Sequence, residues 1–156
     1  MTPSQRAFTL LRDKNQTVTF AESLTGGLIA ATFIGNPGAS AVIGESYVTY
    51  AEASKQRLLG VKKETLDTDG VVSAACASQM ASGARVRSGA DWAVSATGLA
   101  GPDGGTEETP VGTVFIGVSS ANGTLAREFH FSGDRLQVRL QAVEAAFNLL
   151  AEEMEA

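Results

Sequence analysis

Short β-rich runs alternate with segments of helical length along much of this chain, and this alternation constrains the fold more than any other feature. The expected strands are Thr17–Phe20, Val42–Tyr50 and Trp92–Ala96. Leu24–Ile34 and Ala51–Leu59 follow the first two strands and have the length and apolar content of helices. Such alternation indicates an α/β domain, because a helix after one strand returns the chain to start the next strand beside it.

The rest of the chain adds further helices and a hairpin. Asn122-Gly123 is the strongest short signal for a hairpin turn. The other expected elements are a helix capped by Thr2 that ends near Lys14, a helix over Val71–Val86 with Ser73 as N-cap, hairpin strands over Val111–Ser119 and Thr124–Phe131, and a helix over Arg135–Glu155. A length of 156 residues with 44% apolar content fits one core. We expect a single domain over residues 1–156, a three-layer α/β/α fold with a mixed sheet, a C-terminal β-hairpin and a long final helix.

Charge and cysteine content exclude several classes of function. The net charge of −5 offers no basic surface to a nucleic-acid backbone, so no nucleic-acid partner is expected. One cysteine, Cys76, and one histidine, His130, are too few for an internal disulfide or a zinc site of the usual Cys/His kind. No apolar run approaches the ~18 residues of a membrane span, and the N-terminus lacks the apolar segment of a signal peptide. These features predict a protein of the reducing cytoplasm with no membrane partner.

Three polar, glycine-bearing junctions follow expected strands. They are AESLTGG at Ala21–Gly27, TYAEASK at Thr49–Lys55 and TGLAGPDGG at Thr97–Gly105. In open α/β sheets, ligands bind beyond the strand ends, where such junctions gather. No G-x-G-x-x-G or G-x-x-x-x-G-K-[ST] pattern occurs, so the familiar dinucleotide and P-loop sites are not indicated. We expect the site among these three junctions.

Ser23 is the first candidate for chemistry in AESLTGG. A hydroxyl at a strand-to-helix turn is held rigidly and lies near free backbone amides that can stabilise an oxyanion. The competing interpretation is that Ser23 only caps the helix, as most serines at such junctions do. Gly26 and Gly27 equally permit close approach of a ligand or close packing of the helix on the sheet.

A serine nucleophile needs a base, and the chain offers two kinds. His130 lies in the alternating run EFHF, where a polar residue usually faces solvent, so a Ser-His-Asp triad is not expected. Lys55 lies about one turn into its helix and can swing back toward Tyr50 at the strand end. Such a lysine acts as a base only if desolvation or a nearby cation lowers its pKa. Spacing alone favours the alternative of a strand tyrosine and a solvated lysine.

Two further polar features have both a functional and an ordinary interpretation. Asp103, Glu107 and Glu108 crowd one loop, but their spacing matches no defined cation loop, and a solvated acidic loop is the better expectation. Arg135, in SGDR, can meet a phosphate together with the N-terminal amides of the last helix. The alternative for Arg135 is a surface arginine paired with a carboxylate.

A resemblance to a known family is carried by seven short motifs in a fixed order: AESLTGG, NPGAS, TYAEASK, LGV, GVVS, TGLAGPDGG and TPVGTVFIGV. Together they resemble the CinA C-terminal domain family from about Thr17 to Arg139. Seven motifs in one order are far more specific than any one alone. The resemblance implies a compact α/β domain with helices on both sides of a sheet. It also implies the family's best known activity, the hydrolysis of nicotinamide mononucleotide to nicotinate mononucleotide and ammonia in pyridine nucleotide salvage, without a metal or organic cofactor.

The resemblance also implies roles for individual residues. Ser23, Tyr50 and Lys55 correspond to the family's proposed catalytic group, in which Ser23 attacks the amide carbon while Lys55 with Tyr50 moves the proton. Turn amides near Thr25 to Gly27 are expected to hold the oxyanion, and Arg135 to recognise the phosphate. The expected substrate-binding residues are Glu22, Thr25, Gly26, Gly27, Thr97, Gly98, Gly101 and Arg135.

Two departures from the family pattern stand out. Leu24 occupies the position after the serine where the family usually has cysteine, and Thr109 replaces a common lysine before PVGT. The chain has no room for the larger N-terminal domain of many family members, so we expect the stand-alone form, assembled as a homodimer or higher oligomer. The alternatives are a non-catalytic module that binds a pyridine nucleotide or a protein, and hydrolysis of a different amide.

Overall fold

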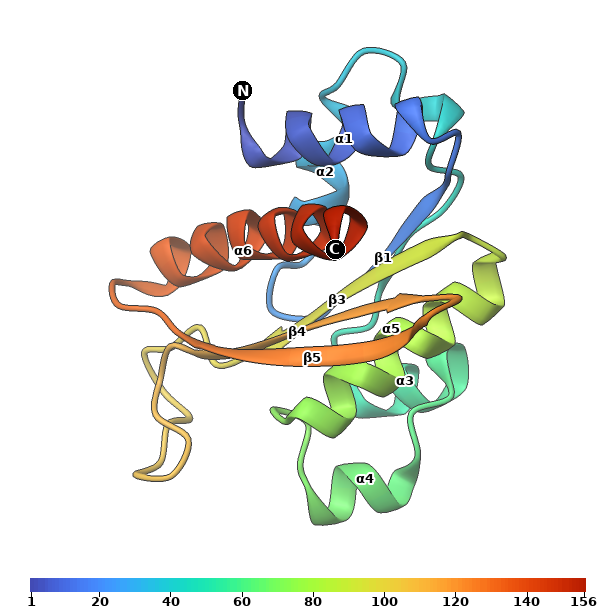
Figure 1. Ribbon diagram of the computed structural model, residues 1–156. Helices are drawn as coiled ribbons and strands as arrows, with labels where there is room; N and C mark the ends of the chain where they lie inside the picture. Colours follow the sequence, from blue (N-terminus) through green and yellow to red (C-terminus); the bar gives the residue numbers. More distant parts are fainter.

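The computed structural model describes residues 1–156 without a gap (Figure 1). Its elements are, in chain order, α1 (Pro3–Asp13), β1 (Val18–Glu22), α2 (Leu28–Ile34), a 3-10 helix η1 (Ala39–Ala41), β2 (Tyr47–Val48), α3 (Glu52–Leu59), α4 (Lys63–Thr68), α5 (Ala74–Ser88), β3 (Trp92–Gly98), β4 (Thr113–Ser120), β5 (Gly123–His130) and α6 (Arg135–Glu155). None of these helices is both long enough and apolar enough to cross a membrane.

The five strands form one mixed sheet in the order β2-β1-β3-β4-β5. β1 lies between β2 and β3 and is parallel to both, while β4 and β5 are antiparallel additions at the other side. The hairpin pairs Ser120 with Gly123, so Asn-Gly closes it as predicted. The mixed sheet is therefore confirmed, and its three parallel strands end at the same edge.

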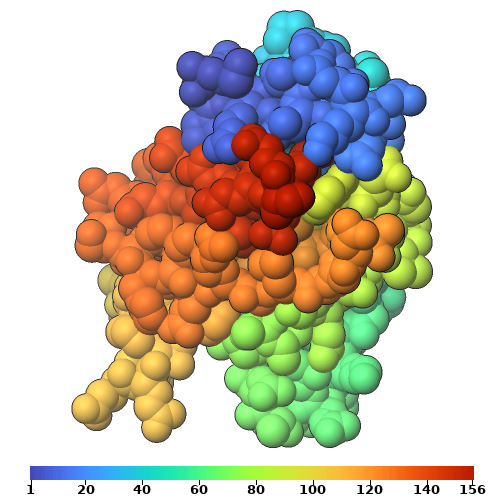
Figure 2. Space-filling model, in the orientation of Figure 1, coloured from blue at the N-terminus to red at the C-terminus, as the bar shows by residue number.

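Helices cover both faces of the sheet, which confirms the three-layer prediction (Figure 1). α1, α2 and α6 pack together on one face, and α3, α4 and α5 lie on the other. In the space-filling view α6 (red) lies between the N-terminal helix and the hairpin (orange), and the loop between β3 and β4 projects from the body (Figure 2). The final helix is thus one of the helices that cover this face of the sheet, and its first turn lies near the ends of the parallel strands.

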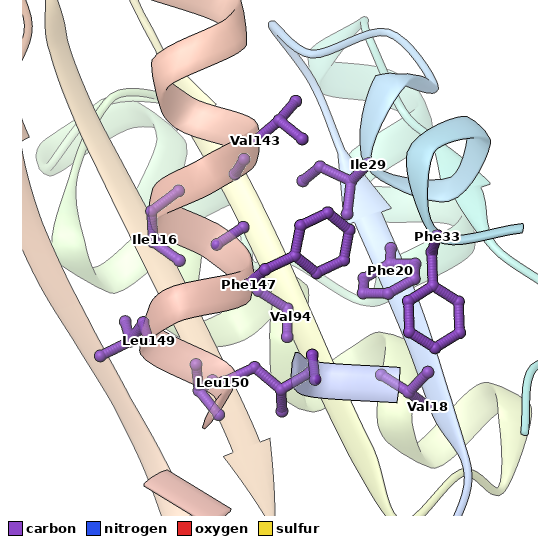
Figure 3. Close-up of a cluster of buried hydrophobic side chains, with 14 of the residues drawn as sticks. Val18, Phe20, Ile29, Phe33, Val94, Ile116, Val143, Phe147, Leu149 and Leu150 are labelled. Atoms are coloured by element: carbon purple, nitrogen blue, oxygen red, sulfur yellow. The ribbon is translucent and has the colours of Figure 1, made fainter. Parts of the chain in front are cut away.

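The larger core cluster fills the space between the sheet and α1, α2 and α6 (Figure 3). Phe20 of β1 meets Phe33 of α2 and Phe147 of α6 edge to face, with ring centroids 5.4 and 5.8 Å apart. Such aromatic contacts add specific geometry to the burial of apolar area. They fix α2 and α6 against β1, the strand that leads into AESLTGG.

The smaller cluster, under α3, α4 and α5, relies on small residues for close packing. A Cβ atom at Gly83 of α5 would lie 1.7 Å from the carbonyl oxygen of Leu59 at the end of α3, so only glycine fits there. Three alanines of α5, Ala77, Ala81 and Ala84, are fully buried. This close approach holds α3, and with it Lys55, tightly against the sheet.

Several expected boundaries were wrong. The predicted strand Val42–Tyr50 is a strand only over Tyr47–Val48, because the Ser46 hydroxyl bonds both the N–H and the carbonyl of Phe20 in place of a backbone partner. The predicted helix Leu24–Ile34 begins only at Leu28, after a turn. α4 was not predicted, since its six residues are too short to show a helical period.

The expected apolar stripe of the final helix is only partly buried. Val143, Phe147 and Leu150 are buried as expected, but Leu136 and Leu140 are about half exposed. Val138 and Ala142 take their places in the core. The predicted cap residues are confirmed, because Thr2 of α1 and Ser73 of α5 both accept a backbone N–H of the first turn.

Candidate active site

The three polar junctions meet at the edge where β1, β2 and β3 end. A cleft of about 370 Å³ opens there. Its walls come from the turn after β1, the start of α3, the segment before α5, the end of β3 with its following loop, and the first turn of α6. The polar residues of its lining are Ser23, Tyr50, Glu52, Thr97, Asp103 and Arg135.

Ser23 and Lys55 are in direct contact in this cleft region. Lys55 Nζ lies 2.9 Å from Ser23 Oγ. The same nitrogen donates to the carbonyl oxygens of Thr49, at 2.5 Å, and of Tyr50, at 3.3 Å. Three oxygens therefore surround the amine, two of them from the chain just after β2.

Lys55 is a fully buried lysine with no carboxylate partner. Its side chain has no solvent exposure, and it forms no salt bridge with any acidic residue. An ammonium in this position loses its hydration without gaining a counter-ion, which disfavours the charged form. Burial accordingly lowers the pKa of Lys55, and Cys76 and then Glu52 oppose part of that shift.

The oxygens around Lys55 suit both protonation states. As an ammonium, Lys55 has three N–H donors for the three oxygens. As a neutral amine it can keep the two carbonyl bonds and accept the Ser23 hydroxyl proton through its lone pair. A proton can therefore pass between Ser23 and Lys55 without any heavy atom moving.

Ser23 does not cap α2. The N-cap position is Gly27, and Ser23 Oγ accepts from Lys55 and from no turn amide. The capping role belongs to Glu22, whose carboxylate accepts the amides of Gly27, Ile29 and Ala30 at 2.9 to 3.2 Å. The Ser23 hydroxyl is thus left to the cleft, where only 8% of the residue is exposed.

This arrangement changes the role expected for Glu22. Its side chain is fully buried, and both of its oxygens bind backbone amides of the turn and of α2. A negative charge at a helix N-terminus is stabilising. Glu22 therefore holds the turn and does not line the cleft, and the substrate contact expected of it stays a prediction.

The amides available to an oxyanion also differ from expectation. Gly26 N–H is bonded to the Ser23 carbonyl and Gly27 N–H to Glu22, so neither is free. The amides of Leu24 and Thr25 have no acceptor in the protein. Leu24 lines the cleft, whereas Thr25, Gly26 and Gly27 do not. The candidate oxyanion donor at the cleft is Leu24 N–H, one residue after the serine.

Tyr50 stands apart from the serine and lysine side chains. Its ring lines the cleft and is 65% exposed, and its hydroxyl accepts a hydrogen bond from Arg135 at 3.2 Å. Only the backbone carbonyl of Tyr50 contacts Lys55. The structure brings Tyr50 into the same cleft but shows no proton path from its hydroxyl to Ser23.

Arg135 is exposed and lines the cleft, and its electrostatic setting differs from the expected one. It also donates to the carbonyl of Gly101 at 2.6 Å. The N-terminus of α6 is already capped by the Asp134 carboxylate, which accepts Gln137 N–H. A phosphate at Arg135 therefore meets a helix end that already carries a negative charge, contrary to the expected help from helix amides.

Thr97, Gly98 and Gly101 line the cleft on its β3 side. The Thr97 hydroxyl donates to the Val71 carbonyl and so fixes the segment before α5. A Cβ at Gly98 would lie 2.6 Å from the Thr113 carbonyl oxygen, so this glycine allows β3 and β4 to stay paired at the site. These residues shape the wall of the cleft with backbone and hydroxyl groups.

Two functional candidates were missed in the sequence. Arg139 of α6 donates to the carbonyl of Leu24 at 2.8 Å and bears on the Ser23 turn. Its only sequence signal is its position one turn after Arg135. Glu52 lines the cleft close enough to Lys55 to affect its pKa, but a glutamate in a first helical turn looks like ordinary helix chemistry.

Other polar candidates lie outside any such constellation. His130 pairs with Glu128 at 2.6 Å on the exposed strand β5, away from the cleft lining. No group of three or more His, Cys, Asp or Glu side chains in the chain is placed to hold a metal ion, which includes the loop with Asp103, Glu107 and Glu108.

Comparison with known proteins agrees with this architecture. The family model of the CinA C-terminal domain matches residues 2–154. A CinA-like protein of Fervidobacterium nodosum is 44% identical over 143 residues, which are 92% of this chain. This chain covers only 35% of that relative, and about a third of the length of the other curated relatives.

Solved structures extend the agreement to the whole fold. The competence/damage inducible protein CihA of Agrobacterium tumefaciens is 40% identical, with a TM-score of 0.94 over 99% of this chain and 94% of that one. A competence-damaged protein (CinA) superfamily protein of Enterobacter cloacae is 29% identical, with a TM-score of 0.93 over 97% of this chain and 90% of that one. With a family model that matches nearly every residue, this chain belongs to the CinA C-terminal domain family.

Proposed function

We propose that this protein is an amide hydrolase that converts nicotinamide mononucleotide to nicotinate mononucleotide and ammonia in pyridine nucleotide salvage. The observation that carries the proposal is the contact of Ser23 Oγ with Nζ of a buried lysine that has no counter-ion. A lysine in this state is poised to be a base, because burial lowers its pKa. A module that only binds a ligand has no chemical need for such a pair.

The geometry supports a two-step mechanism. Neutral Lys55 takes the Ser23 proton as Oγ bonds to the carboxamide carbon, and the carbonyl oxygen becomes an oxyanion that accepts Leu24 N–H. The ammonium of Lys55 then gives its proton to the leaving nitrogen, which departs as ammonia. The product of this step is an acyl ester on Ser23.

Water completes the cycle by the same proton path. Lys55, neutral again, takes a proton from a water molecule that attacks the ester carbon. The tetrahedral species collapses, Ser23 Oγ leaves and recovers a proton from Lys55, and nicotinate mononucleotide is released. The net reaction consumes one water and frees one ammonia.

The charges that line the cleft suit this substrate. Nicotinamide mononucleotide carries a cationic pyridinium ring and an anionic phosphate. The cleft has the carboxylates of Glu52 and Asp103 and the guanidinium of Arg135. We assign the phosphate to Arg135 and the side of the ring to the carboxylates, and we place Tyr50, which contacts Arg135, beside the bound nucleotide.

Ammonia release from nicotinamide mononucleotide tests the proposal directly. Ser23→Ala and Lys55→Met are expected to lower kcat by about 10³-fold or more, because nucleophile and base act as a unit. Lys62→Met is the matched control, since Lys62 is an exposed lysine outside the cleft lining. Circular dichroism and thermal unfolding of each variant show whether the fold is kept.

Three outcomes contradict the proposal in different ways. A wild-type protein that binds the nucleotide in calorimetry but releases no ammonia is a binding module. Release from nicotinamide or its riboside in preference to the mononucleotide indicates a different amide substrate. Full activity in folded Ser23→Ala shows that the nucleophile is another group.

A further inference from the structure

Arg139 holds the turn that carries the nucleophile. From the second turn of α6, its Nε donates to the Leu24 carbonyl at 2.8 Å and its Nη2 approaches the Thr25 carbonyl at 3.4 Å. The guanidinium forms no salt bridge with any carboxylate. An arginine whose only protein partners are two adjacent carbonyls keeps its full positive charge beside this turn.

The carbonyls and the amides of this turn differ in their hydrogen-bond partners. Gly26 N–H bonds to the Ser23 carbonyl at 3.1 Å and closes a four-residue turn. The carbonyls of its two central residues, Leu24 and Thr25, are those that Arg139 binds, whereas their amides have no acceptor. In a planar trans peptide the N–H points opposite to the C=O, so Thr25 N–H is directed away from Arg139.

Unpaired amides in a buried turn are unusual. Thr25 is fully buried and Leu24 is 5% exposed, yet neither amide is hydrogen-bonded within the protein. The Thr25 hydroxyl is likewise buried without a partner. Buried backbone donors are nearly always paired, and exceptions require a physical reason. Of the two residues only Leu24 lines the cleft, so its amide is the one that a bound acceptor can reach.

We propose that Arg139 is a positioning residue that fixes the turn after Ser23 so that the Leu24 amide, the free donor at the cleft, stays available to the oxyanion. This role rests on the amide-hydrolase function proposed above. The guanidinium prevents the Leu24–Thr25 and Thr25–Gly26 peptides from flipping, and it thereby fixes the backbone conformation of Leu24, whose own amide has no acceptor. A donor held in place has its greatest effect when negative charge develops on the substrate oxygen.

The two possible roles of Arg139, positioning the oxyanion donor and only supporting the fold, predict different effects on kcat and KM. An oxyanion exists only in the transition state, so loss of its support lowers kcat and leaves KM nearly unchanged. Arg139→Gln is therefore expected to lower kcat by about 10- to 100-fold, with KM within about twofold of wild type. Arg139→Lys keeps a charge but not the fork of two donors, and we expect it to recover part of the lost kcat.

Arg127→Gln is the matched control. Arg127 also ties the sheet to α6, through an exposed salt bridge with Glu152, but it lies outside the cleft lining. Arg127→Gln should keep full activity. Its loss of thermal stability should be similar to that of Arg139→Gln. If Arg139→Gln keeps the wild-type kcat, or if it changes KM and kcat together with the unfolding temperature, Arg139 only supports the fold.

The sulfur analogue of the substrate isolates the oxyanion. Thionicotinamide mononucleotide develops a thiolate-like anion, which is a weaker hydrogen-bond acceptor, so wild type should prefer the oxygen substrate. Arg139→Gln should reduce that preference, because it releases the turn that positions a donor able to distinguish oxygen from sulfur. An unchanged ratio of kcat/KM for the two substrates overturns the positioning role, even if both rates fall.

A second measurement separates this inference from the proposed substrate. If wild type releases no ammonia, the proposed function fails. The test is then the rate at which a fluorophosphonate labels Ser23, measured by intact mass for wild type and for each arginine variant. The labelling passes through an oxyanion-like state but needs no amide. Slower labelling of Arg139→Gln than of Arg127→Gln supports the positioning role. Equal rates overturn it, and so does a wild-type Ser23 that is not labelled at all.

Discussion

Lys55 Nζ and Ser23 Oγ lie 2.9 Å apart, although 32 positions separate them in the chain. Ser23 follows β1 and Lys55 lies in the first turn of α3, after β2. β1 and β2 are parallel neighbours, so the two strands end side by side. Sheet topology therefore brings the hydroxyl and the amine together, and the close packing of α3 on α5 keeps the amine away from water.

Lys55→Met should stabilise the protein at neutral pH, because it removes a buried amine without a counter-ion and keeps a side chain of similar length. Burial lowers the pKa of Lys55 from 10.5. Between the lowered pKa and 10.5, the unfolded chain binds the proton more strongly than the folded chain, so wild-type stability rises with pH in that window.

Urea unfolding across pH checks this prediction. The stability advantage of Lys55→Met should be largest below the lowered pKa and shrink as the pH approaches 10.5. Lys62→Met should show no such trend. An advantage that is absent or independent of pH means that the amine is not desolvated.

The pH dependence of kcat/KM should follow the free base form of Lys55. Activity is expected to rise with pH through the lowered pKa of Lys55, since only the neutral amine accepts the Ser23 proton. Glu52 raises the pKa of Lys55, so Glu52→Gln should shift the rise to lower pH. Initial rates of ammonia release over a pH series measure both. A shift of the rise toward higher pH in Glu52→Gln contradicts the assignment of Lys55 as the base. High salt should reduce the difference between Glu52→Gln and wild type, because Glu52 is exposed.

Tyr50→Phe should affect substrate binding more than chemistry. The substitution keeps the Tyr50 carbonyl that accepts from Lys55 and removes only the hydroxyl that bonds Arg135. We expect KM to rise severalfold and kcat to fall by less than about 10-fold, as for loss of a binding contact. A fall in kcat of the size seen for Ser23→Ala, at constant KM, assigns the Tyr50 hydroxyl to the proton path.

Glu22→Gln should destabilise the protein by about 1 to 3 kcal/mol, because it removes a charged acceptor of buried backbone amides. The amide group also places an N–H donor where helix N–H groups point, next to Ile29 and Ala30. Denaturant unfolding gives the loss in free energy. A variant of unchanged stability but much higher KM restores a substrate contact to Glu22.

Arg135→Gln should discriminate between substrates with and without phosphate. KM for nicotinamide mononucleotide should rise by about 10-fold or more, as expected for loss of a charged hydrogen bond. KM for nicotinamide riboside, which lacks the phosphate, should change little. Equal increases for both substrates show that Arg135 acts through Tyr50 and Gly101 and does not bind phosphate.

Sequence patterns alone determined the class of fold. The alternation of strands and helices, the Asn-Gly hairpin and the Thr2 and Ser73 caps predicted elements that the structure contains. These signals are local, since they depend on the periods of helices and strands and on single capping residues. Where a side chain replaced a backbone partner, as Ser46 does beside Phe20, the local signal failed and the predicted strand was too long.

The same limits apply to the candidate site. The junctions AESLTGG, TYAEASK and TGLAGPDGG were visible in sequence, because polar and glycine residues after strands mark the strand ends where ligands bind. Residue types also favoured Lys55 as the general base, because the single histidine was expected to face solvent on a strand. Sequence could not distinguish Ser23 as a nucleophile from Ser23 as a cap, since both roles use the same residue at the same position.

Only the tertiary structure decided what these residues contact. It shows that Glu22 caps α2 and that Ser23 contacts Lys55. It also shows that the Tyr50 hydroxyl bonds to Arg135 and to neither of those two side chains, and that Arg139 binds the turn after Ser23. The physical reason is that a pKa, a free amide or a buried charge depends on every group packed around it. Those groups come from segments far apart in the chain, and their positions follow from the packing of α3, α5 and α6 on the sheet.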